Sequence, residues 1–250
     1  MGFTLPEGSY LYFDGKLKAD GTLYEVFQGY CLALTLCYPA GRATCRAVQD
    51  LDAPDAVELF IDEYDKFAYD PDDLIRFDLR QSRSVKSVFA RVESQLETSD
   101  FNALRNSLEF FTWYLSEPRI RTRLLYLSIC LESLFLEGEG EGIGYKLGLR
   151  CGQFLCAFNK HVEPESVFTQ VRNGYALRSK IIHGSDYNKE SSKQIKRGDA
   201  TTELDHVLSL EKIVKHALSA IFHREDLFEA SRSGKLGSLI DKKYLLSNPH

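Results

Sequence analysis

Two residues that suit acid–base chemistry on a phosphate stand near the end of the segment RNGYALRSKIIHGSDY, residues 172–187. They are Arg178 and His183, five positions apart. A histidine can take a proton from a ribose 2′-hydroxyl and give one to the 5′-oxygen that leaves. An arginine can hold the phosphate through two hydrogen bonds and stabilise the charge of the transition state. The pair therefore suits cleavage of RNA without metal, because the 2′-hydroxyl is the nucleophile.

The same residues also suit a helix that simply ends. Gly184 is typical of the position just beyond a helix, and the helix dipole favours histidine and other basic residues in the last turn. On a straight helix, five residues place the two side chains about 140° apart, so they flank one edge. A second copy of the helix across a two-fold axis would bring both pairs into one cleft.

Neighbouring side chains on the same segment have roles in such a site. Lys180 and Arg172 are expected to bind neighbouring phosphates. Tyr175, one turn before Arg178, is expected to stack on a base or to position the arginine. Ser179 can donate a hydrogen bond to phosphate. We therefore include these four residues in the candidate site.

Glu132 is a further candidate because it stands inside the apolar run LLYLSICLESLFL. A buried carboxylate is costly unless it is paired, so this residue is expected to meet a basic side chain. Arg178 and Arg150 are both possible partners. Arg150 is also a candidate for RNA binding.

The elements that carry these residues are predicted to be helices. Apolar residues recur at helical spacing over 85–96, and Ser99 or Asp100 is the expected N-cap of the next helix. Pro118 precedes an almost uniformly apolar helix that ends in the glycine-rich linker GEGEG. Three more helices follow, GYKLGLRCGQFLCAF, PESVFTQVRNGYALRSKIIHG and ELDHVLSLEKIVKHALSAIFH, with a polar loop, NKESSKQIKRGDATT, before the last. These patterns predict a mainly α-helical bundle.

The sequence predicts three parts of the chain. Residues 1–98 form an N-terminal extension of unknown role, and the turn signals Asp14-Gly15 and Asp20-Gly21 suggest that it contains some β structure. Residues 99–225 are expected to make up the helical bundle, and residues 226–250 to be a C-terminal tail that either frays or caps the bundle. The acidic residues between 50 and 73 are expected to form a solvated face, because their spacing matches no calcium loop.

The composition is that of an ordinary globular protein, with 44% hydrophobic and 27% charged residues in 250. No stretch approaches the roughly 18 apolar residues of a membrane span, and no signal peptide opens the chain, so we expect a cytoplasmic protein. The six cysteines form no CxxC pair, so we expect reduced thiols and no metal site. Residues 142–200 carry 10 lysines and arginines against 5 acidic residues, a balance that suits a polyanion.

Three ordered segments resemble a known family. YALRSKIIHG, preceded by SICLESLFL and then YKLGLRCGQFL, is similar to the Apea-like branch of the HEPN superfamily over roughly residues 99–225. The resemblance implies a HEPN-type helical bundle, commonly a homodimer, with an R-x4-6-H motif that forms a metal-independent endoribonuclease and needs no cofactor. By position, Arg178 and His183 take the catalytic roles, and Ser179 stands where catalytic members often have Asn, Asp or His.

The resemblance also implies a biological setting. Many members act as toxins or anti-phage effectors, which implies an antitoxin or regulatory partner. A non-catalytic HEPN module that binds RNA or a protein partner is the alternative function. Tyr187, in HGSDYNKE, loosely resembles a tyrosine that a partner nucleotidyltransferase adenylylates, so it is a candidate modification site.

Overall fold

The computed structural model describes most of the chain from residue 79 onward and short pieces before it. The described residues are 29, 32–37, 44–45, 59–60, 79–136, 138, 140–196 and 202–245. The chain divides into two compact units, residues 1–98 and 99–250. Each unit is described by itself.

The first unit contains helical and β structure. Residues 32–37 are helical, and Leu32, Leu34 and Leu36 are buried. The strands β1 (Thr44–Cys45) and β2 (Leu59–Phe60) pair antiparallel, and α2 (Leu79–Glu97) is the last element of this unit along the chain. The predicted Asp-Gly turns, and most of the acidic segment, lie outside the described residues.

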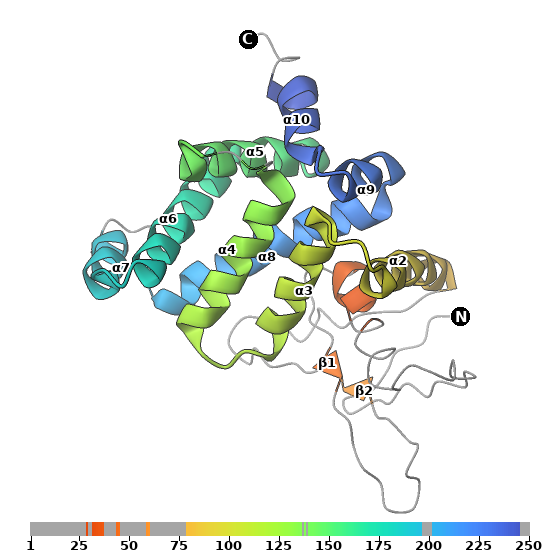
Figure 1. Ribbon diagram of the computed structural model, residues 1–250, viewed down its shortest axis with the longest axis horizontal. Coiled ribbons are helices and arrows are strands. Elements are labelled where there is room, and N and C mark those ends of the chain that lie inside the picture. The colour runs from red at the N-terminus through yellow and green to blue at the C-terminus, as the bar shows by residue number, and fades with distance from the viewer. Residues whose placement is uncertain are drawn as a thin grey trace, which may run out of the picture. The chain divides into compact units, whose positions relative to one another are not determined.

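The second unit is a bundle of helices, so the prediction of a mainly α-helical bundle is confirmed. In Figure 1, α4 and α8 cross the middle of this unit, α5 lies across one end of α4, and α7 lies beside α6. Its helices are α3 (Ala103–Ser116), α4 (Ile120–Phe135), α5 (Ile143–Phe158), α6 (Pro164–Ile182), α7 (Tyr187–Lys196), α8 (Glu203–His223), α9 (Glu225–Arg232) and α10 (Leu236–Ile240), followed by the π-helical turn η2 (Asp241–Leu245).

Helix α4 is central because it carries apolar side chains on most of its surface. It contacts α3, α5, α6 and α8, and seven of its sixteen residues are buried. Helix α8 supplies the other large apolar face, from Val207 to Phe222. Thr202 begins α8 with a capping box, in which its hydroxyl accepts the N–H of Asp205 and the Asp205 carboxylate accepts the N–H of Thr202. These two helices hold α6, which carries the candidate site.

Helices α5 and α6 approach each other along three glycines, one on each turn of α5. A Cβ on Gly152 would lie 2.6 Å from the backbone oxygen of Pro164, and one on Gly148 would lie 2.9 Å from the backbone oxygen of Phe168. A Cβ on Gly144 would lie 2.8 Å from a ring carbon of Tyr175. At Gly148 and Gly152 a side chain would meet the backbone of α6, so glycine is needed there, whereas at Gly144 it would meet only the side chain of Tyr175. The contact fixes α6 against α5 from Pro164 to Tyr175.

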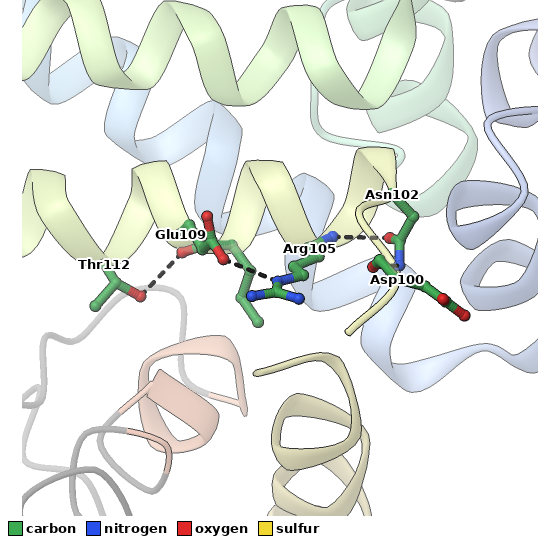
Figure 2. A network of polar contacts seen from close by, with 6 residues as sticks. Asp100, Asn102, Arg105, Glu109 and Thr112 are labelled. Carbon is green, nitrogen blue, oxygen red and sulfur yellow. Dashed lines mark hydrogen bonds and ion pairs between the residues drawn. The ribbon is translucent and has the colours of Figure 1, made fainter. Parts of the chain in front are cut away.

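The expected N-cap of α3 was wrong by two to three residues. Asn102 caps the helix, and its Oδ1 accepts the N–H of Arg105 at 2.9 Å. Asn102 also donates to the carbonyl of Asp100, and Arg105 is paired with Glu109 one turn later (Figure 2). Asparagine is as favourable an N-cap as serine or aspartate, and all three residue types occur between residues 99 and 102. Residue type alone therefore did not decide which of them caps the helix.

One further region differs from its predicted structure, because most of the expected polar loop, residues 188–202, lies in α7. The expected C-terminal tail takes one of its two predicted forms: its residues 226–245 contain most of α9 and all of α10 and η2, which contact the rest of the bundle. An ion pair joins η2 to α5, because both carboxylate oxygens of Asp241 accept hydrogen bonds from Arg150.

Candidate active site

The candidate site begins at the C-terminal end of α6, which ends in a Schellman motif. His183 is the C-cap, and Gly184 follows with a φ of +59°, in the left-handed region that favours glycine. The N–H of Gly184 donates to the carbonyl of Ile181 at 3.3 Å, and that of Ser185 donates to the carbonyl of Lys180 at 3.1 Å. The motif therefore ends the helix and leaves the exposed ring of His183 at its tip.

Arg178 points to α4 rather than along its own helix toward His183. Its Nη2 donates to Glu132 Oε2 at 3.0 Å, and each side chain is 20% exposed. The pair joins the middle of the bundle to the last turns of α6. Of the two partners that the sequence left open for Glu132, the structure selects Arg178.

Burial and charge act in opposite directions on this pair. Burial raises the pKa of the Glu132 carboxyl, and the charge of Arg178 acts in the opposite direction. Glu132 Oε1 and Arg178 Nε are buried and have no hydrogen-bond partner in the described part of the chain. One hydrogen bond thus fixes the arginine, and the guanidinium keeps other N–H groups for a ligand.

Tyr175 lies between α5 and Arg178. Its ring is in contact with Gly144, and the guanidinium carbon of Arg178 lies 5.5 Å from the ring centroid. A ring held in this way can limit the positions of the arginine. Of the two roles predicted for Tyr175, this placement favours positioning of Arg178 over stacking on a base.

The remaining candidates on α6 are spread along the helix. Ser179 and Lys180 are partly exposed and adjoin Arg178, and the carbonyl of Ser179 accepts the N–H of His183. Arg172 is exposed, with its guanidinium carbon 5.9 Å from the Phe168 ring centroid. Eleven residues of helix separate Arg172 from His183, about 16 Å along the axis. An RNA strand that contacts both ends must therefore run along α6.

Arg150 is not available as an RNA-binding residue. It is 6% exposed, its Nε and Nη2 donate to Asp241, and its Nη1 donates to the carbonyl of Phe135. A buried arginine with three hydrogen bonds to the protein is structural. The prediction was wrong because the sequence does not show whether a basic residue on a helix faces solvent or is buried against a later segment of the chain.

Tyr187 is also placed differently from its predicted role. The residue is 5% exposed, and its hydroxyl is buried. Burial, with Glu203 nearby, raises the pKa of Tyr187 to about 12, and Arg121 acts in the opposite direction. Modification of this hydroxyl would require α7 to leave its position first.

The sequence analysis did not single out Arg121, a basic residue that contacts the start of α7. It lies in the first turn of α4, and its Nη2 donates to Asn188 Oδ1 at 2.7 Å. Its guanidinium carbon lies 4.4 Å from the Tyr187 ring centroid. The available signal was the run RIRTR at a helix start, where the helix dipole disfavours positive charge.

Comparisons with models of protein families, with curated proteins and with solved structures gave no match. The likeness to HEPN proteins therefore rests on the three sequence segments. No helix in the described part of the chain is long and apolar enough to cross a membrane. No three His, Cys, Asp or Glu side chains gather as metal ligands among those same residues.

Proposed function

We propose that this protein is a metal-independent endoribonuclease of HEPN type. The main support for the proposal is that one helix, α6, presents an exposed histidine at its end and, about one turn earlier, an arginine held by the half-buried carboxylate of Glu132 on α4. A helix end that served only as a terminator would need Gly184 but not the pair between Arg178 and Glu132. The resemblance adds a role as a toxin or anti-phage effector that a partner restrains.

The proposed reaction is a transesterification within the RNA. His183 takes the proton of a ribose 2′-hydroxyl, whose oxygen attacks the adjacent phosphorus while the bond to the 5′-oxygen breaks. The leaving oxygen receives a proton from a protonated histidine, and Arg178 stabilises the extra negative charge on the phosphate. The products are a 2′,3′-cyclic phosphate and a 5′-hydroxyl. Glu132 and Tyr175 position Arg178.

The test is incubation of the purified protein with total RNA in EDTA, beside Arg178→Ala and His183→Ala. We expect cleavage to persist in chelator, to leave 2′,3′-cyclic phosphate ends, and to fall by at least about 100-fold in each variant. Arg232→Ala and His223→Ala are matched controls, because both residues are exposed in the last turn of a helix. Both controls should cleave as the wild type does.

Two results would contradict the proposal. Activity that disappears in EDTA would remove the metal-independent mechanism. RNA binding without cleavage, unchanged in folded Arg178→Ala and His183→Ala, would favour the alternative of a non-catalytic HEPN module. Circular dichroism of each variant separates loss of the site from loss of the fold.

A further inference from the structure

A second arginine, Arg121, is held beside the end of the candidate active site by two uncharged partners. The Asn188 side-chain oxygen accepts one of its N–H groups at 2.7 Å, and the Tyr187 ring faces its guanidinium carbon at 4.4 Å. These partners begin α7, four and five residues after His183. The contacts therefore join the first turn of α4 to the segment that leaves the active-site histidine.

The uncharged partners distinguish Arg121 from many other arginines of the bundle. Six arginines are paired with carboxylates, namely Arg105, Arg119, Arg150, Arg178, Arg224 and Arg232. Arg121 has no ion pair within the described part of the chain, so no carboxylate occupies its N–H groups. An arginine whose planar group is held in place without a carboxylate partner is suited to bind an anion.

The surroundings of Arg121 are consistent with an anion. The first turn of α4 contains no acidic residue, and its free N–H groups add positive potential. Lys180 is partly exposed and Lys189 is exposed in the adjoining segment. Asp186, Glu190 and Glu203 are the acidic residues nearby: Asp186 accepts the backbone N–H of Lys189 at 3.0 Å, and Glu190 is 3.9 Å from Lys193. Glu203 lies near enough to Tyr187 to raise its pKa, but it forms no ion pair with Arg121.

We propose that Arg121 binds an RNA phosphate next to the one that is cleaved, an inference that rests on the proposed ribonuclease function. Tyr187 covers one face of the guanidinium and Asn188 takes one of its five N–H groups, which leaves an exposed edge for phosphate oxygens. Arg121 and Arg178 then hold successive parts of one strand on either side of His183. Tyr187 and Asn188 position Arg121.

The test measures binding rather than cleavage. The wild-type chain is titrated with a single-stranded 2′-O-methyl RNA, which lacks the nucleophile, at several salt concentrations. We expect Arg121→Gln to weaken binding about tenfold at low salt, the range of one charged hydrogen-bonding contact. We also expect the slope of log affinity against log salt to fall by about 0.7, the value for one lost phosphate contact on a single strand.

Two further variants make the result specific. Arg119→Gln removes the same formal charge two residues away, from a side chain that is 75% exposed and paired with Glu117, so it should change binding little. Arg121→Lys keeps the charge and should retain most of the salt slope. An equal loss in Arg119→Gln would mean a general charge effect, and an equal loss in Arg121→Lys would mean a structural role in holding α7. Either result would overturn the inference.

Different results would contradict the role of Arg121 and the proposed ribonuclease function. Wild-type cleavage of RNA, with unchanged binding and salt slope in Arg121→Gln, would remove the role of Arg121 and leave the ribonuclease in place. No binding and no cleavage by the wild type would remove both.

Discussion

Glu132 is a half-buried carboxylate that positions a candidate catalytic arginine. It stands on the central helix, where burial raises its pKa, and Arg178 offsets only part of that cost. The arrangement is expensive for folding, because the pair makes one hydrogen bond and leaves Glu132 Oε1 without a partner among the described residues. A costly pair of this kind is typical of functional positions.

The raised pKa of Glu132 predicts how stability depends on pH. A carboxyl with a raised pKa in the folded state binds more protons when folded than when unfolded, so its contribution is greatest below its ordinary pKa and falls as pH rises through the folded pKa. The variant Glu132→Gln cannot titrate. We therefore expect the free energy of unfolding to fall more steeply with pH in the wild type than in Glu132→Gln.

Urea unfolding from about pH 4 to about pH 8 measures this difference. Glu165→Gln is the matched control, since Glu165 is an exposed carboxylate in the first turn of α6. Its profile should follow that of the wild type. Parallel profiles for wild type and Glu132→Gln would show that the carboxyl titrates alike in both states.

At the level of elements, the contact between α5 and α6 decides where the site lies. The glycines 144, 148 and 152 repeat every four residues, so they share one face of α5. Their lack of side chains lets α6 approach closely, and Tyr175 and Arg178 are positioned from this contact. The spacing is visible in GYKLGLRCG, but the sequence does not show which helix packs against it.

This contact predicts different costs for two similar substitutions. Gly152→Ala places a Cβ 2.6 Å from the backbone oxygen of Pro164, which can move only with its helix. We expect a net loss of about 1–2 kcal/mol in the free energy of unfolding, after the gain of about 1 kcal/mol from helix propensity. Gly144→Ala meets only the Tyr175 ring, which can rotate away, so its stability should change little.

Thermal and urea unfolding of the two variants test the difference. The ring movement in Gly144→Ala should instead appear as weaker RNA cleavage, because Tyr175 adjoins Arg178. Equal stability of Gly152→Ala and the wild type would contradict the close approach of α5 and α6.

Helix α7 explains why the polar segment after the motif was not predicted as a helix. Its buried positions are Tyr187, Ser191 and Gln194, at helical spacing but with polar groups instead of an apolar stripe. The Tyr187 hydroxyl, Ser191 Oγ and Gln194 Oε1 are buried without hydrogen-bond partners in the described part. Helix prediction relies on an apolar face, and this helix has almost none.

At the scale of the whole molecule, the two catalytic candidates do not meet within one bundle. Arg178 is directed to Glu132 on α4, whereas His183 is exposed at the end of α6, and no contact joins their side chains. A second copy that packs on this helix end would supply the missing neighbour. The homodimer that the family resemblance implies would provide such a copy, and sedimentation of the purified chain tests whether it forms.

Mixing inactive variants tests whether the site is shared between copies. Arg178→Ala and His183→Ala, each inactive alone, should regain part of the wild-type cleavage when they are unfolded and refolded together. Mixed dimers then contain one intact arginine and one intact histidine in a common cleft. Each variant refolded alone is the control, and a mixture as inactive as both controls would assign the two residues to separate sites.

The sequence by itself determined the helical architecture, because apolar spacing, Pro164 and Gly184 act within a few turns of chain. It also indicated the pair Arg178 and His183 and the need for a partner to Glu132. Only the tertiary structure decided that Arg178 is that partner, that Arg150 is buried on Asp241, and that Arg121 reaches α7. These contacts join residues 46 to 91 positions apart, and which distant side chains meet depends on how the helices pack.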